Sequence, residues 1–261
     1  MRVAIVPSEG RGWIVGRICE ELSTHNEWEI RGYDATADFN LFITYFAALT
    51  HMNKPGFKQC RTGAWFTHPE GPEFFKVADL VGVRLCHAPK YARLIGGIAV
   101  QPGIDSGFQP QLVVGISGRS YPSMRKGENL IHLIDSLPYV QVRRAPSKES
   151  WSRSREAWIH SIRDFYLSID VLVVTSSVEG GPMAIAEALA CGTPVIAPND
   201  VGNSELFPVR GYQVGDWDSL RERLEEAWMP RVNLANRAPR SSWQRFSEEV
   251  RDIIATTVEG K

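Results

Sequence analysis

The sequence predicts an α/β protein made of two compact lobes, each built on a parallel β-sheet. Its 261 residues are 43% hydrophobic and 23% charged, which is typical of globular proteins, and they suffice for two such lobes. The first residues have the pattern of a strand, a loop and a helix. Residues 170–197 then place a strand, a helix and a strand in a short span, as the βαβ units of parallel sheets do.

In the first lobe, residues 2–6 are expected to form a buried strand, residues 7–12 a loop, and residues 14–22 a helix. Later apolar runs, rich in β-branched and aromatic residues, predict further parallel strands. These runs are residues 29–33, 40–46, 63–67, 80–85 and 98–101.

Turn-forming residues gather in 102–110, and we place the domain boundary there, between a first domain of residues 1–110 and a second of residues 111–240. Strands and helices are expected to alternate in the second domain. The strands are 112–116, 140–143, 170–175 and 194–197, and the helices are 127–135, 154–168 and 182–191. In the C-terminal segment 241–261, a last helix over 242–257 is expected to pack toward the first domain.

Charge and cysteine usage exclude several classes of protein. Lys plus Arg number 29 and Asp plus Glu number 30, so the net charge of -1 gives no overall attraction to nucleic acid or to an anionic membrane. The four cysteines form no Cys-x-x-Cys pair and the histidines show no metal-ligand spacing, so we expect no metal. Buried free thiols in a reducing compartment are the prediction.

The opening apolar run stops at Pro7 and is too short for a signal peptide or a membrane span, so we expect a cytoplasmic protein without an integral membrane segment. Residues 14–22 carry Glu20 and Glu21 and lack the basic polar face of an interfacial helix, which does not support membrane docking.

The segment that follows residue 175 has the layout of a ligand-binding loop. The strand is expected to end at Ser176, Gly180 and Gly181 let a ligand approach the backbone, and Pro182 suits the first helical position. The free N–H groups of this helix would face the crevice at the carboxyl end of the strand, where open α/β sheets bind ligands and helix N-termini favour anions.

Two carboxylates flank this loop. From the helical rise we expect Glu179 and Glu187 to lie on the order of 10 Å apart. Carboxylates accept hydrogen bonds from vicinal diols, so one could hold a hexose and the other a ribose, with a diphosphate between them. A glycosidase pair that acts on one bond would be closer, roughly 5 to 9.5 Å apart.

A second glycine loop follows the strand at 112–116 and carries Arg119 and Lys126 at its exit. Cations beside a phosphate form charge-assisted hydrogen bonds and stabilise the charge that grows as a glycosidic C–O bond breaks. These residues are therefore candidates to bind a leaving diphosphate.

Together these motifs resemble those of the family 4 retaining glycosyltransferases of the GT-B fold, over most of residues 78–225. The residues that carry the resemblance are the Glu-x7-Glu pair Glu179 and Glu187, the clamp Gly118-Arg119 with Lys126-Gly127, and the linker Gly103-Ile104-Asp105 with Phe108 and Pro110.

The resemblance implies two Rossmann-like, doubly wound domains that face a cleft. It implies a nucleotide diphosphate sugar as donor, transfer of a hexosyl-type unit to an acceptor hydroxyl with retention of configuration, and no metal or other cofactor. Catalytic roles are expected for Glu179, His68, Arg119 and Lys126. The expected donor-binding residues are Gly10, Gly12, Gly118, Arg119, Lys126, Glu179, Gly180, Gly181, Pro182, Met183 and Glu187.

The first domain is shorter than in most members of that family, which leaves the acceptor open among saccharides, proteins, lipids and small molecules. His68 follows a predicted strand where many relatives place an active-site histidine, and its alternative role is capping or packing. Gly10 and Gly12 match the position of the family's donor-phosphate loop, and their alternative role is a tight turn.

Other functions stay open beside this one. A sugar-nucleotide hydrolase or epimerase would use the same donor site, and so would a non-catalytic carbohydrate- or partner-binding protein. The basic stretch 143–155, with Trp151 and with Trp158 just beyond it, favours a solvated face over a nucleic-acid surface because the whole chain is not basic. Trp151 remains a candidate to stack on the donor base.

Overall fold

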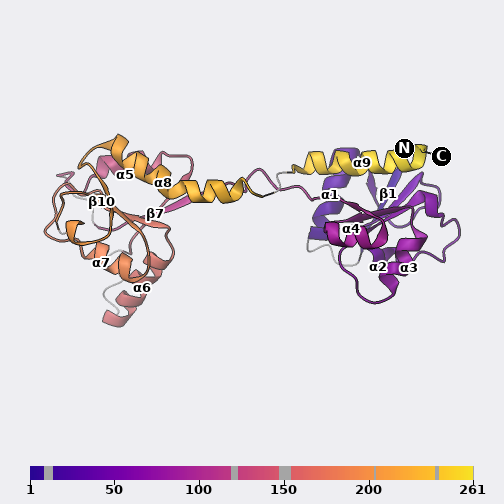
Figure 1. Ribbon diagram of the computed structural model, residues 1–261, viewed down its shortest axis with the longest axis horizontal. Helices are drawn as coiled ribbons and strands as arrows, with labels where there is room; N and C mark the ends of the chain where they lie inside the picture. Colours follow the sequence, from indigo (N-terminus) through magenta and orange to yellow (C-terminus); the bar gives the residue numbers. More distant parts are fainter. Residues whose placement is uncertain (9–13, 119–122, 147–153, 203, 239–240, 261) are drawn as a thin grey trace. The chain divides into compact units, whose positions relative to one another are not determined.

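The computed structural model describes residues 1–8, 14–118, 123–146, 154–202, 204–238 and 241–260 (Figure 1). They form two compact units, Met1–Phe108 with the C-terminal segment from Pro239, and Gln109–Ala238. Each unit is built on a sheet whose strands all pair in parallel. The predicted α/β fold with two parallel-sheet domains is confirmed.

The first unit contains a six-stranded sheet of order β2-β1-β3-β4-β5-β6. Its strands are β1 (Val3–Val6), β2 (Glu29–Ile30), β3 (Phe39–Phe42), β4 (Thr62–Phe66), β5 (Val83–Cys86) and β6 (Ile98–Ala99). The strand order reverses beside β1, because β2 lies on one side of it and β3 on the other. Open sheets bind ligands beside such a reversal, at the carboxyl ends of the strands.

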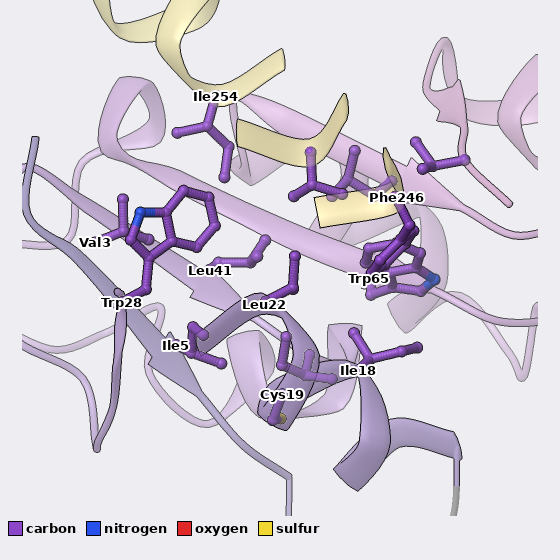
Figure 2. Close-up of a cluster of buried hydrophobic side chains, with 14 of the residues drawn as sticks. Val3, Ile5, Ile18, Cys19, Leu22, Trp28, Leu41, Trp65, Phe246 and Ile254 are labelled. Atoms are coloured by element: carbon purple, nitrogen blue, oxygen red, sulfur yellow. The ribbon is translucent and has the colours of Figure 1, made fainter. Parts of the chain in front are cut away.

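Helices cover both faces of this sheet. They are α1 (Ile14–Asn26), α2 (Tyr45–Leu49), α3 (Glu73–Leu80), α4 (Pro89–Ile95) and α9 (Trp243–Glu259), with the short 3-10 helix η1 (Gln59–Arg61). One core cluster joins α1 and α9 to the sheet through side chains such as Leu22, Trp65 and Phe246 (Figure 2). The last helix therefore completes the core of the first unit.

Several strand predictions in this unit were too long. The strands expected over 29–33 and 98–101 end at Ile30 and Ala99. The strand expected over 40–46 ends at Phe42, because the Thr44 side chain accepts a hydrogen bond from the Ala47 N–H and caps α2. The strand expected over 80–85 begins only at Val83, since Leu80 is the last residue of α3.

The second unit contains a five-stranded sheet of order β11-β10-β9-β7-β8. Its strands are β7 (Leu112–Ile116), β8 (Val140–Arg144), β9 (Val171–Val173), β10 (Val195–Pro198) and β11 (Arg210–Tyr212). Its helices are α5 (Glu128–Asp135), α6 (Arg155–Leu167), α7 (Met183–Ala190) and α8 (Trp217–Ala235), with the 3-10 helix η3 (Ser204–Leu206).

The pairing of β7 with β9 positions the candidate site. Gly115 lies opposite Leu172 and Ile116 opposite Val173, so these two strands end side by side at the same edge of the sheet. The loops that follow Ile116 and Val173 therefore begin next to each other. No helix in the described part of the chain is long and apolar enough to cross a membrane.

Candidate functional site

The site lies in the second unit, where the loop before α5 meets the loop between β9 and α7. Hydrogen bonds and a close backbone approach join the two loops. The Thr175 hydroxyl donates to the Lys126 carbonyl at 2.5 Å, and the Ser177 backbone N–H donates to the Arg125 carbonyl at 3.0 Å. Gly127 has φ 69°, and a Cβ there would lie 2.2 Å from the Thr175 carbonyl oxygen. Only glycine fits this position without displacing the backbone, so Lys126 is held beside the loop of Glu179.

Lys126 and Glu179 form an ion pair between the Nζ and Oε1 atoms. Their side chains are 18% and 14% exposed, which places the pair in a partly dry environment where electrostatic interactions are stronger than in bulk water. The Ser176 hydroxyl donates to the same Glu179 oxygen at 2.9 Å. The two residues therefore lie in direct contact, and Ser176 is a further partner of the carboxylate.

Burial lowers the pKa of the Lys126 amine, and the neighbouring Arg125 guanidinium lowers it further, while Glu128 raises it. The adjacent Glu179 carboxylate also favours the charged amine, because opposite charges in contact stabilise each other. An incoming anion could replace Glu179 as the charged partner of this partly buried amine.

The glycine loop leaves room above the start of α7. A Cβ at Gly180 would meet no atom within 4 Å, and Gly181 has φ 155°. The expectation that Pro182 is the first helical position was wrong by one residue, since Pro182 is the extended N-cap and α7 begins at Met183. Pro182 makes no side-chain cap, so first-turn N–H groups are left for another acceptor.

Gly202, in the loop after β10, packs directly against the segment 179–182. A Cβ at Gly202 would lie 2.8 Å from Pro182 Cδ and 3.2 Å from the Glu179 carbonyl oxygen. The loop after β10 therefore packs tightly against the Glu179 segment and limits its movement.

Glu187 lies on α7 and is exposed to solvent. Its Oε2 accepts a hydrogen bond of 2.8 Å from the phenol of Tyr166, a residue of α6. Nothing in the sequence separation of 21 residues indicated this contact. Helix packing between α6 and α7 creates it, so a sequence pattern could not have identified it.

Several predicted site residues fall outside the described part of the chain. They are Arg119, Gly10 and Gly12, as well as Trp151, the candidate for base stacking. Gly118 is described, with φ 117°, and a Cβ there would lie 3.9 Å from the Lys126 Nζ. The second half of the predicted clamp, Lys126-Gly127, is thus adjacent to Gly118.

His68 belongs to the first unit and follows the carboxyl end of β4. Its Nε2 contacts the Glu70 carboxylate, and both side chains are 56% exposed. The imidazole is therefore solvated and paired locally, unlike the partly buried Lys126 and Glu179.

Among the described residues no group of three or more His, Cys, Asp or Glu side chains could hold a metal ion. Cys19 and Cys86 are buried, as expected for structural thiols. The same expectation was wrong for Cys60, which is exposed, and for Cys191, which is partly exposed.

Comparison with known proteins gives a family match over part of the second unit, together with similar curated proteins and solved structures. Residues 156–229, which include Glu179 and Glu187, match the family described as glycosyl transferases group 1. A D-inositol 3-phosphate glycosyltransferase of Nocardiopsis dassonvillei is 30% identical over 163 residues, which cover 57% of this chain and 36% of that protein. The protein of the same description from Rhodococcus erythropolis is 31% identical over 161 residues, or 58% of this chain and 33% of that protein.

A crystal structure of HepE from Anabaena in complex with UDP-glucose aligns with 98% of this chain and 100% of its own, with a TM-score of 0.41 and 12% identity. The chain spans about a third of the length of the curated relatives it matches. The segment from α6 into α8 therefore carries the sequence pattern of glycosyl transferases group 1.

Proposed function

We propose that this chain is a retaining glycosyltransferase that moves a sugar from a nucleotide diphosphate sugar to an acceptor hydroxyl without a metal ion. The observation that carries the proposal is the partly buried Lys126–Glu179 pair at the carboxyl edge of the second sheet, beside two glycines and an uncapped helix start. The match to glycosyl transferases group 1 over the same loop supports it.

The proposed donor binding exchanges partners within this pair. The diphosphate takes the place of Glu179 against the Lys126 ammonium and accepts hydrogen bonds from the first N–H groups of α7. Glu179, still held by Ser176, is then free to accept hydrogen bonds from hydroxyls of the donor sugar. Glu187 lies about one helical turn after the start of α7 and accepts hydrogen bonds from the ribose hydroxyls.

In the proposed transfer, the acceptor oxygen attacks the anomeric carbon on the face from which the diphosphate departs, and the acceptor proton passes to the leaving phosphate. Lys126 stabilises the negative charge that develops on that phosphate. Arg119 is proposed to assist, and the roles of His68, Gly10 and Gly12 stay predictions from the sequence. This cationic set does the work that a divalent metal does in other transferases.

A panel of nucleotide sugars screened by thermal unfolding tests donor binding. A donor at 100 times its Kd stabilises the folded state by about 2.7 kcal/mol. A matching donor is expected to raise the Tm of the native chain and to leave that of Lys126→Ala unchanged. Lys90→Ala, which removes an exposed lysine of α4, is the matched control and should respond like the native chain.

Product analysis by NMR then tests the reaction. Transfer with retained anomeric configuration, unaffected by a chelator, is the expected result. Consumption of the donor in the absence of any acceptor would instead identify a hydrolase or an epimerase. Absence of stabilisation by every nucleotide sugar would contradict the proposed function itself.

A further inference from the structure

Tyr166 is a buried phenol bonded to a solvent-facing carboxylate. It lies near the end of α6 and is only 1% exposed, whereas its partner Glu187 lies on the exposed side of α7. The phenol donates to Glu187 Oε2 at 2.8 Å. This hydrogen bond engages one oxygen of the carboxylate and does not involve the other, Oε1.

The position of Tyr166 is fixed by its surroundings. Its backbone carbonyl accepts a hydrogen bond from the Thr193 hydroxyl at 2.8 Å, and its ring packs in a core cluster with Ile185 of α7. Burial raises the pKa of the phenol, and the hydrogen bond to Glu187 raises it further. The phenol therefore stays protonated and serves as a lasting hydrogen-bond donor.

A carboxylate held at one oxygen is well placed to receive a diol at the other. A flexible exposed glutamate loses rotamer freedom when it binds a ligand, and that loss reduces the affinity. Tyr166 removes much of this loss in advance, because it fixes the Glu187 side chain before the ligand arrives. A ribose then gains hydrogen bonds from both of its ring hydroxyls, whereas a 2′-deoxyribose gains one fewer.

We propose that Tyr166 is a positioning residue that gives the site its selectivity for ribonucleotides over 2′-deoxyribonucleotides, acting through Glu187. This inference rests on the proposed function, since it requires that Glu187 face the ribose of a bound nucleotide. It adds a determinant of donor specificity that lies outside the glycine loop and on a different helix.

The network extends beyond these two residues. The Ser117 hydroxyl is hydrogen-bonded to the Tyr166 phenol, and Ser117 directly precedes Gly118 at the end of β7. The loop proposed to bind the diphosphate and the carboxylate proposed to bind the ribose are thus joined through one buried side chain.

Calorimetric titration with UDP, GDP and ADP and with their 2′-deoxy counterparts tests the inference on the full chain. For the nucleotide that binds, we expect the ribo form to bind the native chain about tenfold more tightly than the deoxy form, the effect of one hydrogen bond to a charged group. In Tyr166→Phe the ribo form, which has two hydrogen bonds to Glu187, should lose more affinity than the deoxy form, which has one, so that the preference falls below about threefold.

Tyr212→Phe is the matched control. Tyr212 is also 1% exposed in the same unit, and its phenol donates to the Val174 carbonyl at 3.0 Å. The same one-atom change there removes a buried hydrogen bond of the core, and the ribose preference should stay at its native value.

Each outcome decides the inference. If the native chain binds none of the nucleotides, the proposed function fails and the inference with it. The inference alone is wrong if a nucleotide binds and Tyr166→Phe keeps the native preference for the ribonucleotide. It is also wrong if the variant binds the ribonucleotide and the 2′-deoxyribonucleotide more weakly by the same factor. Should the Phe variant not fold, a crystal structure of the native chain with the bound ribonucleotide decides, because the inference requires Glu187 to accept from the Tyr166 phenol and from the ribose hydroxyls at once. A ribose-bound Glu187 that has left the phenol would overturn the inference.

Discussion

The carboxyl edges of the two sheets are built differently. In the second unit, Lys126 and Glu179 are 18% and 14% exposed, and hydrogen bonds from Thr175 and Ser176 fix both of their loops. In the first unit, His68 and Glu70 form a local pair that is 56% exposed at each side chain. The difference shows that the Lys126–Glu179 pair lies in an organised, partly dry environment, whereas the His68–Glu70 pair is solvated.

The largest effect on activity is expected from removing one partner of the Lys126–Glu179 pair. Glu179→Ala should lower kcat/KM for transfer by roughly 10³-fold, as the loss of a preorganised polar group in a dry site does. Steady-state kinetics with the matching donor measure this effect. Glu225→Ala, which removes a half-exposed carboxylate of α8 paired with Arg221, is the control and should keep native activity. Comparable losses in both variants would contradict the special role of the loop.

Gly127→Ala should disrupt the same site through the backbone. The residue has φ 69° and its new Cβ would lie 2.2 Å from the Thr175 carbonyl oxygen, so we expect a loss of roughly 2 to 4 kcal/mol in the free energy of unfolding. Urea denaturation measures it. At Gly180, where a Cβ meets no atom within 4 Å, the same substitution should change the free energy of unfolding by less than about 0.5 kcal/mol. Equal destabilisation at the two positions would show that the loops are not joined as described.

Ser176→Ala is expected to lower activity less than Glu179→Ala does. The hydroxyl donates to Glu179 Oε1 at 2.9 Å, and its loss should lower kcat/KM by about three- to tenfold, the effect of one hydrogen bond. Ser177→Ala removes a weaker bond of 3.3 Å to the Arg125 carbonyl and should have less effect. A native rate in Ser176→Ala would indicate that Glu179 does not need this partner.

The pH dependence of donor binding tests the charge of Lys126. Binding of a diphosphate needs the ammonium form, and the pKa of Lys126 is lowered by burial. Affinity should therefore fall as the pH rises through this lowered pKa, at a lower pH than for an exposed lysine. In Lys126→Arg the side chain keeps its charge over the same range, so the alkaline decline should disappear. An identical decline in both proteins would assign it to another group.

The smallest effect on activity is expected from a substitution in the first unit. His68→Ala should lower kcat by about tenfold or less, because an exposed, solvated imidazole stabilises charge less than a buried group does. The donor KM should stay unchanged in this variant. A loss as large as that of Glu179→Ala would show that the first unit's edge becomes as organised as the second's during the reaction.

The sequence predicted the parallel architecture because buried strands such as 112–116 are short apolar runs with clear ends. The strand expected over 170–175, with its end at Ser176, was too long, since β9 ends at Val173. The sequence missed α2, α3 and α4 in the first unit and α8 and β11 in the second. Only Leu220 and Leu224 are buried in α8, and Pro230 interrupts its helical pattern, so it lacks the apolar stripe by which helices are recognised. β11 has three residues, too few for a periodic signal.

For the site, Glu179 and Lys126 were predictable as neighbours, since each follows a strand and parallel strands end at one edge. Tyr166 and Thr175 were not, because their contacts depend on how α6 packs on α7 and on the backbone conformation at Gly127. Sequence spacing carries no information about such tertiary contacts.

A crystal structure with the matching nucleotide sugar bound tests the central claim most directly. The account predicts that the Lys126 ammonium has left Glu179 and lies within hydrogen-bonding distance of a diphosphate oxygen, with Glu179 accepting from the sugar. A donor bound elsewhere on the chain, with the Lys126–Glu179 pair intact, would contradict it.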